Sequence, residues 1–239
     1  MLQVQGLSVS YRDVLALQNI NCEVAPGELV GIVGPNGAGK STMVKAMLGL
    51  VNSAAGSIQF CGLPLSRQLL QVAYVPQRSQ IDWDYPITVW HVAMMARTVH
   101  AGLFRRPSRQ SRELVQAALE RVGMYELRDR RIGELSGGQQ QRVFIARALA
   151  KQANLLIFDE PFTGVDRKTE DIIFDVFHEL KAQAKTLLVI NHDLGETLNH
   201  YDRIMLLNKQ VIAVGPKEVV MTAQNLQAAY GDALKFAAA

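Results

Sequence analysis

The sequence has few of the features that would place it in a specialised class. Its 239 residues include only two cysteines, Cys22 and Cys61, which are far apart in the chain and have no nearby ligand spacing. Neither a disulfide framework nor a zinc site is therefore indicated. We expect both cysteines to be buried as small apolar residues.

Long apolar runs and a secretory start are also missing. No run approaches the roughly 18 residues that a membrane-spanning helix needs. The first five residues have no basic start followed by an apolar core. We therefore expect the chain to stay in the cytosol.

A strong charge of either sign is lacking as well. The net charge is +3, with 20% charged and 49% hydrophobic residues, as in ordinary globular proteins. This balance does not argue for nucleic acid, and it neither excludes nor indicates a membrane surface. The length suits one large domain, or one domain with a subdomain, and is ample for a hydrophobic core.

What the sequence does contain is a glycine-rich loop, residues 34–42, between an apolar strand at residues 29–33 and a helical pattern at residues 40–50. The loop has the full G-x-x-x-x-G-K-[ST] pattern in its strand and helix context. Its glycines let the backbone turn consecutive N–H groups inward, where the helix start adds partial positive charge. A glycine-rich turn that caps an ordinary helix would leave that context unexplained. The predicted phosphate-binding residues are Gly34, Pro35, Asn36, Gly37, Ala38, Gly39, Lys40, Ser41 and Thr42.

Three side chains of this loop have separate predicted roles. Lys40 would reach the β- and γ-phosphates of a nucleotide, and the hydroxyl of Ser41 would take a Mg²⁺ position. Thr42 would add a phosphate contact from the first turn of the helix.

Apolar periodicity predicts the remaining elements. We expect antiparallel strands early in the chain, buried parallel strands later, and a helical insertion from Arg78 to about Ala150. The predicted strands are residues 2–11, 20–24, 57–60, 70–75, 155–158, 187–190, 204–207 and 211–214, and the predicted helices are residues 88–99, 109–122, 138–150 and 168–182. The last four residues are expected to be frayed. The pattern predicts an α/β fold with a parallel-sheet core, an antiparallel β subdomain and an inserted α-helical subdomain.

Two adjacent carboxylates, Asp159 and Glu160, end the buried strand that begins at Leu155. Successive side chains of a strand point to opposite sides. Asp159 could therefore face a metal held by Ser41 while Glu160 projects toward the terminal phosphate and a water, dividing the roles of metal ligand and general base. An acidic turn before Pro161 would account for the two carboxylates alone. It would not account for their occurrence in one chain with the phosphate-binding loop.

A third signal is Leu-Ser-Gly-Gly-Gln at residues 135–139, which opens a predicted helix. Ser136 is a typical N-cap residue. The free N–H groups that follow it could also form a second phosphate surface. One chain cannot use both phosphate sites on one nucleotide if they lie on different subdomains, whereas two copies could.

These motifs together resemble an ATP-binding-cassette (ABC) ATPase, in order and over nearly the whole chain. The matching residues are 34–42, Gln77, 135–139, Asp159, Glu160, Asp166 and His192, and Leu-Ser-Gly-Gly-Gln is the discriminating motif. The resemblance implies a P-loop NTPase (RecA-like) fold in a single ABC ATPase domain. Residues 1–77 and 151–239 would form the nucleotide-binding core with the β subdomain, and residues 78–150 the helical subdomain. ATP and Mg²⁺ would be the cofactors and ATP hydrolysis the reaction.

The resemblance also implies a head-to-tail dimer with two ATP molecules at its interface. Each ATP would lie between the phosphate-binding loop of one copy and Ser136, Gly137, Gly138 and Gln139 of the other, with Asp166 in the loop that crosses the interface.

The remaining roles follow from the same resemblance. Gln77 would link Mg²⁺ and the attacking water to the helical insertion, His192 would contact the γ-phosphate, and Tyr11 would stack on adenine. The implied catalytic residues are Glu160, His192 and Gln77, and the implied Mg²⁺ ligands are Ser41, Gln77 and Asp159.

Some of these residues have other interpretations. Tyr11 could be an ordinary strand aromatic, and His192 could cap the end of its strand. Residues 163–166, Thr-Gly-Val-Asp, keep the aspartate of the commonest family form, Ser-Ala-Leu-Asp, but not its first two residues. The other histidines, His91, His100, His178 and His200, lack such context and are interpreted as surface or satisfied residues.

Two classes of ABC protein fit these motifs: the motor of a membrane transporter, or a soluble ATPase of chromosome maintenance or translation. Chromosome-type members separate the two phosphate motifs by a long coiled coil, whereas about a hundred residues without heptads intervene here. Translation-type members usually carry two cassettes. A single cassette is similar to the ATPase subunit of a bacterial-type importer, peripheral on the cytoplasmic face of the cell membrane. Its partners would be a second copy, integral membrane permease subunits and, indirectly, a solute-binding protein, without nucleic acid.

Residues 73–89 closely resemble the branch that serves manganese, zinc or chelated-iron importers, and residues 104–108 and 163–170 agree. Asp-Trp-Asp at residues 82–84 resembles the manganese side most, so manganese is favoured, then zinc or iron, with a non-metal substrate as the alternative. Asp82 and Asp84 are interpreted as a solvated loop or a partner contact rather than metal ligands.

The segment expected to face the permease departs from the family at His91, where aspartate is usual, and at Ala96, where glycine is usual. These departures concern the pairing with the partner, not the ATP chemistry. The group Arg105, Arg106, Arg109 and Arg112 could suggest nucleic acid or anionic lipid, and a solvated helix entry near the membrane is the simpler account.

Overall fold

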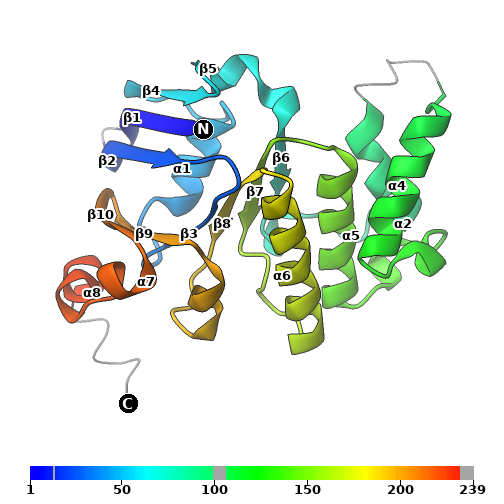
Figure 1. The fold of residues 1–239 in the computed structure, drawn as a ribbon. Helices are drawn as coiled ribbons and strands as arrows, with labels where there is room; N and C mark the ends of the chain where they lie inside the picture. Colours follow the sequence, from blue (N-terminus) through cyan, green and yellow to red (C-terminus); the bar gives the residue numbers. More distant parts are fainter. Residues whose placement is uncertain (13, 99–105, 232–239) are drawn as a thin grey trace.

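The chain folds into two sheets with helices packed around them (Figure 1). The computed structural model describes residues 1–12, 14–98 and 106–231. The predicted frayed end, His100 and Arg105 lie outside the described residues.

The first sheet is antiparallel and has the order β2-β1-β4-β5. Its strands are β1 (Leu2–Tyr11), β2 (Val14–Val24), β4 (Ala55–Phe60) and β5 (Leu63–Pro64). β1 and β2 form a hairpin whose pairing runs from Leu2 opposite Val24 to Tyr11 opposite Val14. Alternate side chains of these strands are buried, because only one face of this sheet packs on the core.

The second sheet has six strands in the order β10-β9-β3-β8-β7-β6. They are β3 (Leu29–Val33), β6 (Val72–Val75), β7 (Leu155–Asp159), β8 (Thr186–Ile190), β9 (Arg203–Asn208) and β10 (Gln210–Gly215). All neighbours pair in parallel except β9 and β10. Every residue of β3, β7 and β8 is buried, as expected for strands covered on both faces.

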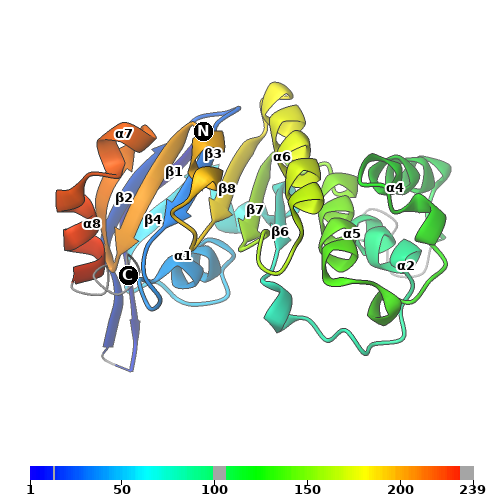
Figure 2. The same cartoon turned by 90° about the horizontal axis from the view of Figure 1, so that it is seen from below.

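Each face of the six-stranded sheet packs against its own apolar cluster. One cluster joins β1 and β2 to α1 (Lys40–Met47), and the other joins the opposite face to α5 (Gly137–Ala150) and α6 (Arg167–Ala182). α2 (Val89–Met94) and α4 (Arg109–Arg121) pack against α5 at the far end of the molecule from β1 and β2 (Figures 1 and 2). The short helices α7 (Lys217–Val220) and α8 (Ala223–Tyr230) cover β9 and β10.

Short 3₁₀ segments connect these elements. They are η1 (Leu65–Arg67), η2 (Leu69–Gln71), η3 (Arg78–Gln80), η4 (Met95–Arg97), η5 (Tyr125–Leu127), η6 (Ile132–Glu134) and η7 (Glu196–His200). The segment η3 begins directly after Gln77, where the chain leaves the sheet for the helical part.

The predicted architecture is confirmed: a mostly parallel sheet, an antiparallel sheet and a helical insertion between β6 and β7. The subdomain boundaries at residues 77 and 150 stay a prediction. Several element ends were predicted wrongly. The strand predicted from Leu70 begins at Val72, because Leu69–Gln71 forms η2 with Leu70 exposed. The predicted helix over residues 88–99 is α2 followed by η4, and α1 ends three residues before Leu50.

The prediction for the cysteines is right for one and wrong for the other. Cys22 is buried in β2, and burial raises the pKa of its thiol to about 12. Cys61 is exposed at the turn between β4 and β5, with a left-handed backbone (φ 50°). A turn residue at the edge of a sheet has no core to enter, whatever its side chain prefers.

Candidate active site

The glycine-rich loop lies between β3 and α1, as predicted. Gly39 takes a left-handed backbone (φ 96°), and a Cβ there would lie 2.5 Å from the Leu17 side chain and 2.8 Å from the Ala16 carbonyl oxygen of β2. Only glycine fits this position. The close contact fixes the loop against the β1–β2 hairpin, and no side chain caps the first N–H groups of α1. These N–H groups are therefore free to bind an anion.

Lys40, the first residue of α1, is buried inside this loop. Its ammonium donates to the carbonyl oxygens of Gly34 (2.6 Å) and Pro35 (3.0 Å). Burial lowers the pKa of Lys40 below its ordinary value, and the charges of Glu160 and Asp159 oppose that shift. A buried cation whose partners are neutral carbonyls is the group that a phosphate would stabilise.

Asp159 is the last residue of β7 and is only 2% exposed. Within the described residues, the one side-chain hydrogen bond to its carboxylate comes from the hydroxyl of Tyr74, at 3.3 Å. Burial raises the pKa of Asp159, and the neighbouring Glu160 carboxylate raises it further. A buried carboxylate with so little compensation fits a site built for a cation, and oxygen ligands are those that Mg²⁺ prefers.

Glu160 does not continue the strand. The prediction that the two carboxylates point to opposite sides because both lie in a strand is therefore wrong in its reason. Its backbone is left-handed (φ 52°), and the chain turns there before Pro161. This turn, rather than the period of a strand, separates the side chains of Asp159 and Glu160.

Polar side chains from three neighbouring strands gather at the carboxylate of Glu160. Gln77, two residues after β6, donates from Nε2 to Glu160 Oε2 at 2.7 Å. His192, two residues after β8, places Nδ1 3.6 Å from the same oxygen. Because β6, β7 and β8 are adjacent and parallel, their carboxyl ends meet at one edge of the sheet. The structure therefore brings together the three residues predicted as catalytic.

Thr163 is a member of this group that the sequence analysis did not assign. Its hydroxyl donates to Glu160 Oε2 at 3.3 Å, and its backbone N–H donates to the Glu160 carbonyl oxygen at 3.3 Å. A threonine three residues after a predicted base, with a proline and a glycine beside it, was the available signal for such a turn.

The Ser136 segment begins α5 on the helical side. The Ser136 hydroxyl accepts from the Gln139 N–H (3.3 Å), and the Gln139 side chain accepts from the Ser136 N–H (2.9 Å). This reciprocal pair is a capping box, so the predicted N-cap is confirmed. No hydrogen bond or ion pair in the described part of the chain joins this segment to the glycine-rich loop.

Asp166 and Tyr11 also lie apart from the Glu160 group. Asp166 caps α6 by accepting from the Thr169 N–H at 2.7 Å, and this hydrogen bond holds the pKa of its carboxyl below the ordinary value. Tyr11 is 44% exposed near the tip of the β1–β2 hairpin, a few residues beyond the part of β2 that contacts Gly39. In the described structure, no hydrogen bond or ion pair joins either side chain to the loop.

The described structure offers no metal site at the two aspartates of the Asp-Trp-Asp segment. Asp82 and Asp84 are exposed, and Asp82 accepts from the Asp84 N–H (3.1 Å) as in a solvated turn. Among residues 1–12, 14–98 and 106–231, no three His, Cys, Asp or Glu side chains are grouped to hold a metal ion. In the same part of the chain, every helix is too short or too polar to cross a bilayer.

Comparison with known proteins identifies the family. Residues 17–163 match the family model described as ABC transporter. Because the match covers more than half of the chain, this protein belongs to the ABC transporter ATP-binding family, a class of P-loop ATPases. The predicted family, fold class and ATP-hydrolysing activity are thus confirmed.

Several members of this family are similar to the chain over nearly its whole length. The chain is 46% identical over 235 residues to the manganese transport system ATP-binding protein MntB of Bacillus subtilis, covering 98% of this chain and 94% of that one. It is 45% identical over 230 residues to the zinc transport system ATP-binding protein TroB of Treponema pallidum, covering 96% and 86%. A solved nucleotide-free ATP-binding cassette from an ABC transporter superposes with a TM-score of 0.83 at 26% identity, covering 95% and 97%. Proteins of this kind dimerise and work with membrane permeases.

Proposed function

We propose that this chain is the ATP-driven motor of a membrane importer for a divalent transition metal, with manganese favoured and then zinc or iron. The observation that carries the hydrolytic part is the meeting of Gln77 and His192 at the carboxylate of Glu160. The metal part is supported by the relatives named for manganese and zinc transport and by the resemblance of residues 73–89 to that branch.

In the proposed reaction, Glu160 is the general base that accepts a proton from the attacking water. Gln77 and His192 hold its carboxylate at the edge of the sheet, and His192 also contacts the γ-phosphate. Lys40 exchanges its carbonyl acceptors for the β- and γ-phosphates. The negative charge of these phosphates then stabilises the buried ammonium.

Mg²⁺ fits the proposed site through hard oxygen ligands. The Ser41 hydroxyl, the Asp159 carboxylate and the Gln77 side-chain oxygen would hold it. Bound there, Mg²⁺ would neutralise the negative charge that develops on the phosphates. The phenol of Tyr74 keeps the Asp159 carboxylate oriented in its buried position.

The second phosphate surface requires a second copy of the chain, in the head-to-tail arrangement. Ser136 is exposed at the start of α5, and no hydrogen bond joins it to the loop of its own chain in the described residues. We propose that ATP bound at Lys40 of one copy reaches Ser136 of the other, with Asp166 beside the shared interface. Because the γ-phosphate is contacted from both sides only in the closed dimer, ATP favours closure and ADP does not.

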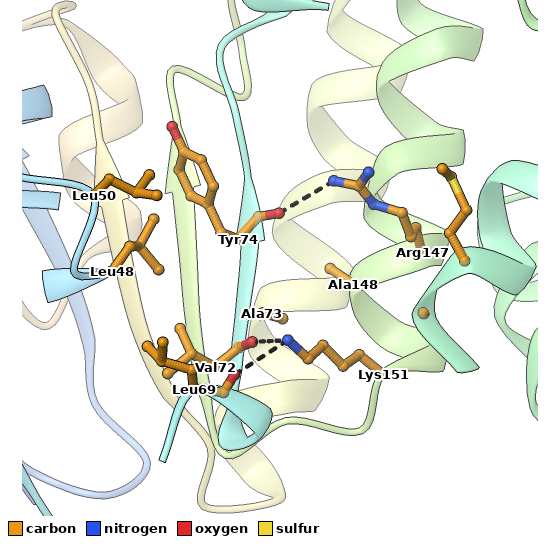
Figure 3. Close-up of a pocket in the computed structure, with 11 residues that line it drawn as sticks. Leu48, Leu50, Leu69, Val72, Ala73, Tyr74, Arg147, Ala148 and Lys151 are labelled. Carbon is orange, nitrogen blue, oxygen red and sulfur yellow. Dashed lines mark hydrogen bonds between the residues drawn. The ribbon is translucent and has the colours of Figure 1, made fainter. Parts of the chain in front are cut away.

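A groove between the sheet and the helices is the proposed contact with the permease (Figure 3). It has a volume of about 420 Å³ and lies between the end of α1, the start of β6, η4 and α5. Leu50 and Met95 on its rim are 67% and 52% exposed. Exposed apolar side chains around a hollow are typical of a surface that another protein covers.

The groove also offers positive charge. Arg147 of α5 and Lys151, directly after α5, point across it toward β6, where Arg147 donates to the Tyr74 carbonyl oxygen at 3.3 Å and Lys151 donates to that of Val72 (Figure 3). Burial lowers the pKa of both side chains, and no acidic residue lines the groove. The matching permease segment would therefore be apolar with an acidic residue or a helix carboxyl end.

Deletion of the gene in its host tests the proposed function. We expect poor growth and low uptake of radiolabelled manganese when manganese is limiting, with both restored by the wild-type gene. Neither Glu160→Gln, which removes the base, nor Met95→Glu, which places a charge on the groove rim, should restore them. Expression of each variant is checked by immunoblot.

The other outcomes of this test are equally definite. A defect confined to zinc or iron limitation would move the substrate to that metal, and the absence of any metal-dependent defect would refute the metal assignment. Full restoration by Met95→Glu would refute the groove as the permease contact.

A further inference from the structure

Arg78 lies between the Glu160 group and the helical part of the molecule. It directly follows Gln77, but its side chain runs to a different partner: Nε and Nη2 both donate to the Gln140 side-chain oxygen of α5, at 3.1 and 2.8 Å. Hydrogen bonds from a charged donor are about twice as strong as those between neutral groups. Two consecutive residues thus bond to different parts of the molecule. Gln77 bonds to Glu160 at the end of β7, and Arg78 bonds to α5.

The acceptor on α5 is held firmly. Gln140 is 3% exposed, and its Nε2 donates to the Ile132 carbonyl oxygen at 3.1 Å. Both ends of its amide are therefore occupied, which fixes its orientation. Arg78 consequently bonds to a rigid point of the helical part rather than to a mobile surface side chain.

Arg78 is half-buried and has two further neighbours, Trp83 and Gly137. The Trp83 indole N–H donates to the Arg78 carbonyl oxygen at 3.0 Å, and the guanidinium lies 5.5 Å from the Trp83 ring centre. A Cβ at Gly137 would come within 3.2 Å of the guanidinium carbon. The first glycine of the Ser136 segment therefore leaves the space that Arg78 fills, and an exposed loop acquires a fixed position.

The consequence is a short mechanical path between two parts of the proposed reaction. One end is the Gln77 side chain, which occupies Glu160 Oε2 at 2.7 Å. The other end is the first turn of α5, which carries Ser136 and Gly137 and would face the nucleotide of the second copy. Only one peptide bond separates Gln77 from Arg78, so a shift of α5 that keeps the Arg78–Gln140 bonds displaces the backbone beside Gln77.

We propose that Arg78 is a positioning residue for ATP hydrolysis, which sets the place of Gln77 on Glu160 according to the position of α5. The proposal rests on the proposed role of Glu160 as the general base. It implies that a phosphate bound at Ser136 affects the base through the Arg78–Gln140 bond, and that Arg78 itself touches neither ATP nor water.

Steady-state ATP hydrolysis by the purified full-length chain tests this proposal. Arg78→Met keeps the apolar stem and removes the donors, and Gln140→Leu removes the acceptor. We expect each to lower kcat about tenfold, with KM for ATP changed less than twofold, because neither residue binds the nucleotide. The double variant should lose no more than either single variant. Arg78→Lys, which can make one of the two bonds, should retain an intermediate kcat.

The matched control is Arg128→Met. Arg128 is another arginine of the helical part that lies over an aromatic ring, 4.5 Å from the Tyr125 ring centre, but it has no bond to α5. The kcat of Arg128→Met should remain within twofold of the wild-type value. If Arg78→Met and Arg128→Met gave equal rates, the proposal would be overturned.

A second cycle separates positioning from a general loss of structure. In a Gln77→Ala background there is no Gln77 side chain to place, so Arg78→Met should cause no further loss of kcat. A tenfold loss on top of Gln77→Ala would show that Arg78 does not act through Gln77 and would overturn the proposal. If Arg78→Met does not fold, as judged by its thermal unfolding, Gln140→Leu carries the same comparison.

Glu160→Gln in the same assay tells failure of this proposal from failure of the proposed base. If Glu160→Gln hydrolyses ATP normally, the role of Glu160 is wrong. If Glu160→Gln is inactive and Arg78→Met is fully active, only the positioning role is wrong.

Discussion

The two helix starts that would meet one nucleotide are built in opposite ways. At α1, the N-cap residue is Gly39, no side chain caps the first turn, and the ammonium of Lys40 is buried in the loop. At α5, Ser136 and Gln139 satisfy each other in a capping box, and Ser136 is exposed while the residues after it are half-buried. The first site is open to an anion in the isolated chain. At the second, which we call the closed site, the capping box already pairs the N–H groups of Ser136 and Gln139.

This difference teaches how the two sites can act in sequence. A phosphate at α1 gains free N–H groups and a buried cation, so it can bind there without help. A phosphate at α5 finds the N–H groups of Ser136 and Gln139 already paired, so fewer donors are left for it and it gains less. We infer that α1 captures the nucleotide and that α5 adds its contact only when a second copy presents the nucleotide.

The largest expected effect comes from Glu160→Gln, which should separate binding at the two sites from hydrolysis. We expect hydrolysis to fall by on the order of a hundredfold or more, because the general base is lost while the shape of the side chain is kept. ATP should still bind, and gel filtration with ATP should show an accumulated dimer. Glu196→Gln, which changes an exposed carboxylate on η7, is the control. A normal hydrolysis rate in Glu160→Gln would remove it as the base.

Lys40→Ala tests the open site. Removing a buried, charge-assisted contact should weaken ATP binding about 10- to 100-fold, since such a bond contributes about 1.5–3 kcal/mol. Equilibrium titration with a fluorescent ATP analogue measures this on the monomer. Lys217→Ala, at the start of α7, removes a half-buried lysine that bonds to Asn199, and it should bind ATP normally. Unchanged affinity in Lys40→Ala would exclude it from the phosphate site.

Ser136→Ala tests the closed site and should have the smallest effect. We expect nucleotide affinity of the monomer to stay unchanged, while ATP-dependent dimerisation and hydrolysis fall about tenfold. Loss of the cap itself should cost about 1 kcal/mol of unfolding free energy. Ser108→Ala is the matched control, because Ser108 caps α4 in the same way, through the Ser111 N–H at 3.1 Å. If both variants dimerise equally well, the comparison between α1 and α5 fails.

Much of the fold was predictable because its elements depend on local patterns. The continuous apolar runs at Leu29 and Leu155 are fully buried parallel strands, and the alternation from Leu2 is a half-buried strand. Element ends were less accurate, because tertiary contacts decide them. Leu70 looks apolar enough for a strand, but the turn of η2 leaves it exposed.

The residues of the candidate site were predictable by type, but their contacts were not. Gln77, Glu160 and His192 each follow a predicted strand, and adjacent parallel strands bring them together. The left-handed turn at Glu160 has no sequence signal, because glutamate rarely adopts it. The bond from Arg78 to Gln140 spans 62 positions and depends on the packing of α5, which no local pattern encodes.

The left-handed backbone of Glu160 places the proposed hydrolysis in opposition to the stability of the folded protein. A non-glycine residue in that region costs on the order of 1 kcal/mol, and asparagine tolerates it better than glutamate. Selection for heat resistance alone would thus favour a residue that has no suitable carboxylate. On the proposed role of Glu160 as the general base, a chain with asparagine there would be more stable and would not hydrolyse ATP, so this turn would link the activity to a cost in stability.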